Sequence, residues 1–250
     1  MSKMSIDLRK YWDDRLASNL NLKGTGHRAF SLGYNQILYQ AQADCLTSLL
    51  NKWRVNLAHK WILDVGCGTG FYVDYYMKRG AERVYGIDIS ETSVKYLTEK
   101  FPDCIFAVED ISRASLGYLG SFDFISAISV LYHVIDDKLF EQAIKNLCLL
   151  CKPGGYLLIS DVFEGRWRPS AQHAHMRILA QYQPYMENFE VLEIAPIYYL
   201  LNRSYIPFIG PKVIDIFRIG KVFYRIDERL RRKGTKNGSG MKFMLAQRML

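Results

Sequence analysis

Hydrophobic positions follow two different periods along the chain, and the change between them falls near Trp61. Apolar residues recur every three or four positions over residues 6–20 and again over residues 35–54, which predicts two amphipathic helices. Residues 21–34 contain three glycines and few periodic apolar positions, so we expect a loop there. From Trp61 onward, short apolar runs alternate with helical stretches, a pattern typical of βαβ units and a parallel sheet.

This alternation predicts strands and helices in turn. The expected strands are Trp61–Gly66, Arg83–Ile89, Cys104–Asp110, Phe122–Val130, Gly155–Phe163, Phe189–Ile197 and Met241–Met249. The expected helices between them are Phe71–Arg79, Glu91–Phe101, Asp136–Cys151 and about Ala174–Glu187. Asp136 and Asp137 fall where a helix N-terminus favours negative charge. Residues 198–239 interrupt the alternation before the last strand and include an amphipathic stretch from about Ile214 to Arg232.

Composition places the chain among ordinary globular proteins. It has 250 residues, of which 49% are hydrophobic and 23% charged, so we expect one elaborated domain and no extended disorder. Five cysteines are too few for a disulfide scaffold. No apolar stretch approaches the ~18–20 residues that span a bilayer, and the first residues lack an apolar signal core. We therefore expect a cytoplasmic protein with reduced cysteines.

The net charge of +8 is concentrated at one end of the chain. Residues 200–250 carry 12 Lys and Arg against 3 Asp and Glu, whereas residues 1–199 carry 21 against 22. An argument from charge to a partner therefore applies only to the C-terminal fifth.

A glycine-rich run joins the first expected strand to the next helix. It reads Asp64-Val65-Gly66-Cys67-Gly68-Thr69-Gly70. A sharp turn needs residues without a Cβ, and so does a ligand that lies against the backbone. The N-terminus of the helix offers free N–H groups to a carboxylate or phosphate. Asp88 ends the second expected strand, where a carboxylate can accept hydrogen bonds from both ribose hydroxyls.

The spacing of this run separates two cofactor classes. A dinucleotide-binding turn reads G-x-G-x-x-G, whereas this chain reads G-x-G-x-G after Asp64. That form resembles the cofactor loop of the class I S-adenosylmethionine (SAM) methyltransferases. Four further segments are similar to that family in the same order. They are Asp110-Ile111, Phe122-Asp123, Ser129 to His133, and Leu150 to Ile159, in which Cys151 replaces a commoner small or apolar residue.

The resemblance covers roughly residues 60–165 and implies that SAM is the cofactor. It assigns cofactor binding to Asp64, Gly66, Gly68, Gly70, Asp88, Ile89, Asp110, Ile111 and Ser129. It implies that Asp88 binds the ribose, that Asp110 and Ile111 meet the adenine, and that Ser129 acts through its carbonyl at the methionine end. A purely structural role stays open for each residue, such as shaping the turn or capping nearby N–H groups.

Methyl transfer from a sulfonium is an in-line displacement, and oxygen or nitrogen acceptors must lose a proton. His133 lies just past the fourth expected strand, on the edge where the resemblance places the sulfonium, and its ordinary pKa suits a base near neutrality. We therefore expect His133 to be the catalytic base, with a hydrogen bond that supports the fold as the alternative. Tyr132 is expected to pack in the core, with positioning of the acceptor as the alternative. The segments around Tyr11, Arg15 and Tyr34 resemble a lid that contacts the cofactor or acceptor, or else packs on the sheet.

Several motifs that are missing from the chain narrow the class of molecule that could accept the methyl group. The segment Ser129 to His133 lacks the Pro-Pro-Tyr or Pro-Pro-Phe of enzymes that methylate base amines, and no Pro-Cys nucleophile is present. We therefore expect no nucleic-acid partner. His173 and His175 form an H-x-H pair without a matching ligand set, so no metal is expected, and one of them lining the acceptor pocket is an alternative.

The basic C-terminal fifth has three interpretations. The first is a cap over an apolar or aromatic acceptor at residues 198–232. The second is a helix in weak contact with a membrane surface. The third is a solvated helix whose apolar side packs on the domain.

Together these features predict one α/β domain, residues 1–250, with a Rossmann-like, mainly parallel seven-stranded sheet and helices on both faces. We expect an N-terminal helical lid at 1–58, a SAM-binding core at 59–165, and a C-terminal half at 166–250 with a cap insertion at about 198–239. The predicted activity is methyl transfer to a small molecule, at oxygen, in natural-product, lipid or glycan biosynthesis. Alternatives are N- or C-methylation, a non-catalytic SAM-fold protein, and a nicotinamide-dependent oxidoreductase.

Overall fold

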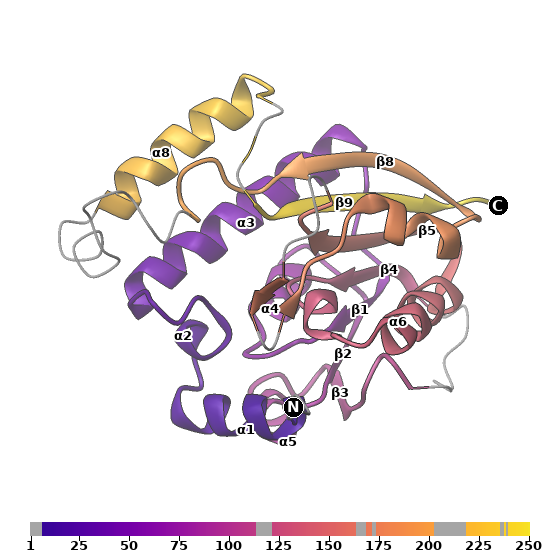
Figure 1. The fold of residues 1–250 in the computed structure, drawn as a ribbon. Coiled ribbons are helices and arrows are strands. Elements are labelled where there is room, and N and C mark those ends of the chain that lie inside the picture. The colour runs from indigo at the N-terminus through magenta and orange to yellow at the C-terminus, as the bar shows by residue number, and fades with distance from the viewer. Residues whose placement is uncertain are drawn as a thin grey trace.

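The computed structural model describes residues 7–113, 122–163, 169–171, 174–202, 219–235, 238 and 240–250. The strands are β1 Trp61–Val65, β2 Arg83–Asp88, β3 Ile105–Val108, β4 Phe122–Ala127, β5 Cys151–Asp161, β6 Pro169–Ala171, β7 Ala174–His175, β8 Phe189–Pro196 and β9 Lys242–Arg248. Seven of them form one sheet in the order β3-β2-β1-β4-β5-β9-β8 (Figure 1). Strands β1 to β5 pair in parallel, and β9 is antiparallel to both neighbours. The predicted α/β fold with a mainly parallel seven-stranded sheet is confirmed.

Helices lie on both faces of this sheet (Figure 1). The α-helices are α1 Leu8–Ser18, α2 Leu22–Thr25, α3 Leu32–Lys52, α4 Phe71–Met77, α5 Glu91–Lys100, α6 Asp137–Leu150 and α8 Ile219–Arg232. The 3-10 helices are η1 Leu131–His133, η2 Leu179–Gln181 and η3 Gln183–Tyr185. Because strand side chains alternate, Ile62 joins the apolar core under α3 and α4, while Leu63 joins the core under α6.

Short polar residues set the starts of the main helices. Asp136 accepts hydrogen bonds from the N–H groups of Lys138 and Leu139, so the predicted acidic start of α6 is confirmed. Ser31 and Ser90 cap α3 and α5 in the same way.

The loop predicted at residues 21–34 is partly wrong. Residues 22–25 form α2, whose N-terminus is capped by the Asn21 side chain, and α3 already begins at Leu32. One turn of helix is too short to show a hydrophobic period, so the glycines dominated the sequence pattern.

The helix predicted at about Ala174–Glu187 is wrong. The chain there forms β7 and the two 3-10 turns η2 and η3. The backbone of Arg177 is drawn into tertiary contacts, since its N–H donates to the Asp161 carboxylate and its C=O accepts from the N–H of Phe163. Pro184 lies in η3 and has no N–H for a helical hydrogen bond. These contacts override the helical pattern.

Strand limits differ most from the predictions at β4 and β5. β4 ends at Ala127, three residues early, because Ser129 has a positive φ of 61° that breaks the extended chain. β5 begins at Cys151, and its pairing with β4 shifts register between Phe122 and Phe124. The Pro153-Gly154-Gly155 segment is therefore an irregular part of the strand. From the sequence, the strand is expected to begin only at Gly155.

The insertion before the last strand is anchored at both described ends. Asp227 of α8 is buried and accepts hydrogen bonds from the N–H groups of Tyr199 and Leu200. Residues 203–218 lie outside the described residues, and with them the first part of the stretch predicted from Ile214. In the part of the chain that the structure describes, no helix has the length and apolarity needed to cross a bilayer.

Candidate active site

Two loops meet at the point where the strand order reverses, between β1 and β4. The glycine loop follows β1, and the segment leading to η1 follows β4. They touch, because a Cβ on Gly66 would lie 2.3 Å from Cγ2 of Val130. Ligands of open α/β sheets bind at such a switch point, beyond the carboxyl ends of the strands.

The three glycines of the loop all have positive φ, with values of 71° at Gly66, 53° at Gly68 and 80° at Gly70. A side chain at Gly68 would also lie 2.7 Å from Cγ2 of Thr25, at the end of α2. The loop backbone is therefore bare, and the N-terminal segment lies directly against it.

Asp88 ties this loop to the end of β2. One carboxylate oxygen accepts a hydrogen bond from the N–H of Gly68 at 2.8 Å, and the other accepts one from Ser90 at 2.9 Å. Burial raises the pKa of Asp88, while these hydrogen bonds lower it. A carboxylate has about four acceptor positions. The N–H groups of Gly68 and Ser90 fill two of them, and the Ser93 hydroxyl lies close to the same carboxylate. Ile89 follows and is half-buried.

Asp64 lies in β1 beneath the loop and is 2% exposed. Its Oδ1 accepts a hydrogen bond from the Ser126 hydroxyl at 2.7 Å, whereas Oδ2 has no hydrogen-bond partner in the described part of the chain. Burial raises the pKa of Asp64 to about 7, helped by the nearby charge of Asp88. A cation at this point would supply the missing partner.

Asp110 and Ile111 follow β3. Oδ1 of Asp110 accepts hydrogen bonds from both the N–H and the hydroxyl of Ser112, at 2.9 and 2.6 Å. Ile111 is buried, and its C=O accepts a hydrogen bond from the Asn146 side chain. Asp110 thus caps the next turn with one oxygen, as the structural alternative expected, and adenine binding remains a prediction.

Ser129 stands at the turn after β4 with a φ of 61°, which is unusual for a residue other than glycine. Its N–H donates to the Ser160 hydroxyl of β5 at 2.7 Å, and this hydrogen bond holds the turn. Strained backbone of this kind is concentrated at functional sites. Ser160 could not be singled out from the sequence.

His133 ends η1 beside two aromatic rings. Its ring centroid lies 4.4 Å from that of Tyr132 and 5.1 Å, edge to face, from that of Trp12 in α1. Burial raises the pKa of the Tyr132 phenol to about 12, so it stays protonated at neutral pH. The structure thus places an N-terminal tryptophan against the predicted base, a contact that helical spacing in α1 did not reveal.

Helix α1 is fastened to the cofactor side of the sheet. Asp13 accepts hydrogen bonds from the Ser90 hydroxyl at 2.6 Å and from the N–H of Thr92 at 3.2 Å. Arg15 donates to the C=O of Gly26, which holds α1 to the end of α2. Because Ser90 also donates to Asp88, the N-terminal segment and the predicted ribose-binding acid share one hydrogen-bond network.

Tyr34, by contrast, does not face this loop. Its hydroxyl donates to the C=O of Leu201 at 2.9 Å, and its ring stacks on Phe30. It therefore fastens α3 to the insertion, which is the packing role left open for it.

Tyrosines from three parts of the chain gather around Gln42 of α3. Tyr72 donates to the side-chain oxygen of Gln42, whose nitrogen donates to Tyr198, and Tyr39 donates to Thr25 beside the glycine loop. We call Tyr39, Gln42, Tyr72 and Tyr198 the tyrosine cluster. Tyr39 and Gln42 lie in the helix predicted over residues 35–54, but helical spacing did not reveal their polar roles.

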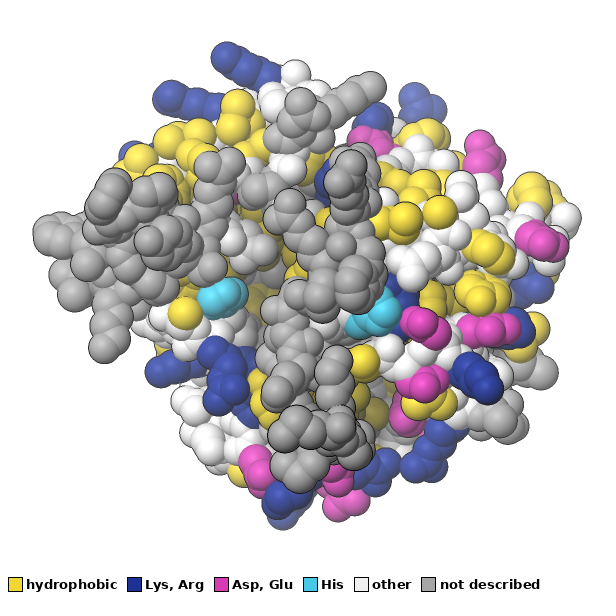
Figure 2. Space-filling model, in the orientation of Figure 1, with side chains coloured by type: hydrophobic (Ala, Val, Ile, Leu, Met, Phe, Trp, Pro, Cys, Tyr) yellow, Lys and Arg dark blue, Asp and Glu magenta, His cyan; other side chains and the backbone are white. Residues whose placement is uncertain are grey.

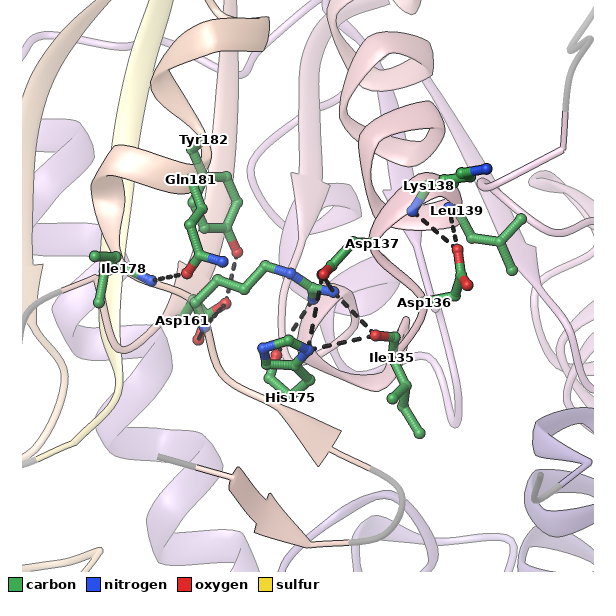
Figure 3. A network of polar contacts seen from close by, with 11 residues as sticks. Ile135, Asp136, Asp137, Lys138, Leu139, Asp161, His175, Ile178, Gln181 and Tyr182 are labelled. Atoms are coloured by element: carbon green, nitrogen blue, oxygen red, sulfur yellow. Dashed lines mark hydrogen bonds and ion pairs between the residues drawn. The ribbon is translucent and has the colours of Figure 1, made fainter. Parts of the chain in front are cut away.

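A second network lies at the carboxyl end of β5 (Figure 3). Asp161 accepts a hydrogen bond from the Tyr182 hydroxyl at 2.6 Å. The fully buried guanidinium of Arg177 donates to Asp137 at 2.9 Å and lies over the Phe140 ring. His175 approaches the same Asp137 carboxylate at 3.8 Å. The network joins β5 and β7 to the start of α6. His173, the other histidine of the H-x-H pair, lies outside the described residues.

Comparison with known proteins matches the part of the chain that holds this site. Residues 63–159 match the family described as "Methyltransferase domain". This part of the chain is a class I SAM-dependent methyltransferase domain. The family was predicted from the glycine loop and its four companion segments, and that prediction is confirmed.

The curated relatives of the methyltransferase domain act on different molecules. A ubiquinone biosynthesis O-methyltransferase of Chromobacterium violaceum is 34% identical over 115 residues, which are 43% of this chain and 46% of the relative. A 2-methyl-6-phytyl-1,4-hydroquinone methyltransferase of Synechocystis is 37% identical over 103 residues, 40% of this chain and 31% of the relative. The chain thus spans about half, or less, of the length of these relatives.

Solved structures share the fold over nearly the whole chain. Magnesium protoporphyrin IX methyltransferase from Synechocystis, with SAM bound, has a TM-score of 0.63 at 18% identity and covers 99% of this chain and 100% of its own. A cyclase has a TM-score of 0.62 at 18% identity and covers 100% and 98%. Because that neighbour is named for a different reaction, the fold alone does not fix the activity.

Proposed function

We propose that the chain transfers a methyl group from SAM to a small-molecule acceptor, at oxygen, in the biosynthesis of a natural product, lipid or glycan. The observation that carries the proposal is the polar lining of the switch point. There the bare glycine backbone, the spare acceptor positions of Asp88 and the unpartnered oxygen of Asp64 lie together.

These residues fit SAM part by part. The hydroxyls of its ribose match the remaining acceptor capacity of Asp88. Its ammonium group matches the buried Oδ2 of Asp64, which has no hydrogen-bond partner among the described residues. When bound, SAM supplies an electrophilic methyl group on a sulfonium.

The chain's own residues then perform three tasks. The glycine loop and Asp88 hold the cofactor, while α1 and α2 cover the loop and exclude water. A ring nitrogen of His133 accepts the proton of the acceptor hydroxyl. Trp12 and Tyr132 fix the orientation of the His133 ring between them.

For the acceptor we favour a phenolic hydroxyl on an aromatic ring. The relatives named for ubiquinone biosynthesis and for a phytyl hydroquinone support this class. The tyrosine cluster, which joins the glycine loop to α3, supplies ring faces and hydroxyl groups suited to an aromatic ligand.

The test is transfer of a labelled methyl group from SAM to a panel of phenols, sugars and lipids. We expect transfer to phenols, and His133→Ala should lower kcat by about 100-fold or more at unchanged SAM affinity. Tyr132→Phe, which keeps the ring and loses the hydroxyl, is the matched control and should retain most of the activity. Full activity in His133→Ala would refute the base assignment. SAM binding without transfer to any acceptor would favour the non-catalytic alternative.

A further inference from the structure

The outward face of α8 carries two parallel rows of side chains with different chemistry. Lys221, Arg225 and Arg229 follow one another at four-residue spacing and are exposed. Val222, Ile226 and Leu230 form the neighbouring row, displaced by one residue. Val222 is 54% exposed, and the other two are half-buried. We call these the basic row and the apolar row.

The acidic residues of α8 do not neutralise the basic row. Asp227 is buried on the opposite side of the helix, where it caps Tyr199 and Leu200. Glu228 pairs with Arg231 and Arg232, each at 3.0 Å. Within the described residues, no carboxylate lies within ion-pair distance of the basic row.

Helix α8 is held firmly in this orientation along α3 (Figure 1). Tyr224 donates to the Asp44 carboxylate at 2.5 Å, and Arg231 donates to the C=O of Ile197 at 3.1 Å. Gly220 lies so close to Tyr34 that a Cβ would come within 2.8 Å of its ring. Both rows therefore form a fixed part of the surface.

In the space-filling view, Lys and Arg side chains project from the upper left of the molecule, over α8, with hydrophobic surface beside them (Figure 2). We propose that this face of α8 docks on the surface of a bilayer that contains anionic lipids. The basic row would lie among the lipid phosphates, and the apolar row would enter the boundary with the acyl chains.

An anionic lipid surface fits both rows, whereas a nucleic acid fits only one. Phosphates of either kind attract the basic row. Only a lipid interface also takes up exposed Val222 and the partly exposed apolar side chains beside it. The proposal goes beyond the proposed function and does not require it.

The test measures co-sedimentation of the full chain with vesicles of phosphatidylcholine alone or mixed with phosphatidylglycerol, at low and high salt. We expect binding to the mixed vesicles only, weakened by salt. Each basic residue contributes about fivefold to partitioning, so Arg225→Glu with Arg229→Glu should lower binding by more than about 25-fold. Lys95→Glu with Lys138→Glu, exposed positions on α5 and α6, is the matched charge control and should bind as wild type.

Three results would overturn the proposal: no binding to the mixed vesicles, equal loss of binding in both double variants, or binding to a short RNA duplex in place of vesicles. Val222→Ser should also weaken vesicle binding, because a purely electrostatic contact would not depend on this side chain.

Calorimetry with SAM on the same preparations separates the docking proposal from the proposed function. A chain that binds SAM but no vesicles refutes only the docking surface, and one that binds vesicles but not SAM refutes only the proposed function.

Discussion

At the scale of single residues, the site depends on left-handed backbone, which favours glycine. Gly66 combines a left-handed conformation with close contact to Val130, while Gly234 has a similar φ of 67° and no atom within 4 Å of an added Cβ. The two positions therefore separate the cost of backbone strain from the cost of a clash.

We predict that Gly234→Ala costs about 1–2 kcal/mol of unfolding free energy, the usual strain of a left-handed residue. Gly66→Ala should cost about 1–3 kcal/mol more because of the overpacking against Val130, and it should abolish SAM binding. Chemical denaturation measures both values. Adding Val130→Ala to Gly66→Ala should restore part of the stability, and equal losses for the two glycines would show that the contact with Val130 is not tight.

Asp64 makes the stability of the fold depend on pH. Burial raises its pKa to about 7 in the folded chain, whereas the ordinary value is 3.8. As pH rises, the unfolded chain therefore loses this proton first. The contribution of Asp64 to stability is complete below about pH 4 and is lost as pH rises through 7.

We predict that Asp64→Asn removes this pH dependence. Relative to the variant, the wild-type chain should lose about 2–3 kcal/mol of unfolding free energy between pH 5 and pH 8. Urea unfolding at the two pH values measures the difference. If the wild type and the variant gave parallel profiles, Asp64 would be ionised throughout, and its unpartnered oxygen would not mark a site for a cation.

At the scale of elements, helix α1 is attached to the start of α5 beside the glycine loop. Asp13 receives two hydrogen bonds from the start of α5, while its neighbour Asp14 is exposed and pairs only within α1, with Lys10, among the described ion pairs. Asp13 therefore fastens the helix, and Asp14 serves as a control of equal charge.

We predict that Asp13→Ala lowers amide hydrogen-exchange protection in α1 by about tenfold or more, because a charged hydrogen bond to a carboxylate contributes about 1.5–3 kcal/mol. Exchange followed by mass spectrometry gives the measurement, with Asp14→Ala expected to match the wild type. Unchanged protection in Asp13→Ala would mean that Trp12 and Arg15 suffice to hold the helix.

The elements also show what local sequence could predict. Strands β1 to β5, their helices and the glycine loop follow from hydrophobic period and turn chemistry, which are local properties. The segment after His173 could not be predicted, because Asp161 and Tyr182 determine its path from across the fold. Trp12, Asp13 and Gln42 were missed as site residues for the same reason, since their partners are distant in sequence.

At the scale of the whole molecule, the fold brings together one end of the sheet, the N-terminal segment and the C-terminal insertion. Tyr34 and Tyr198, on α3 and after β8, join these parts by hydrogen bonds to Leu201 and Gln42. The family match covers residues 63–159 only, so the segments that complete the site lie outside it. The proposed acceptor binding and the proposed docking on a bilayer both depend on these segments.

Binding of SAM is the central claim, and isothermal titration calorimetry of the full chain with SAM, S-adenosylhomocysteine and NAD tests it most directly. We predict that the first two bind and NAD does not. Asp88→Ala should weaken SAM binding by at least about tenfold, since hydrogen bonds to a charged group contribute about 1.5–3 kcal/mol each. Binding of NAD in place of SAM, or SAM affinity unchanged in Asp88→Ala, would contradict the account.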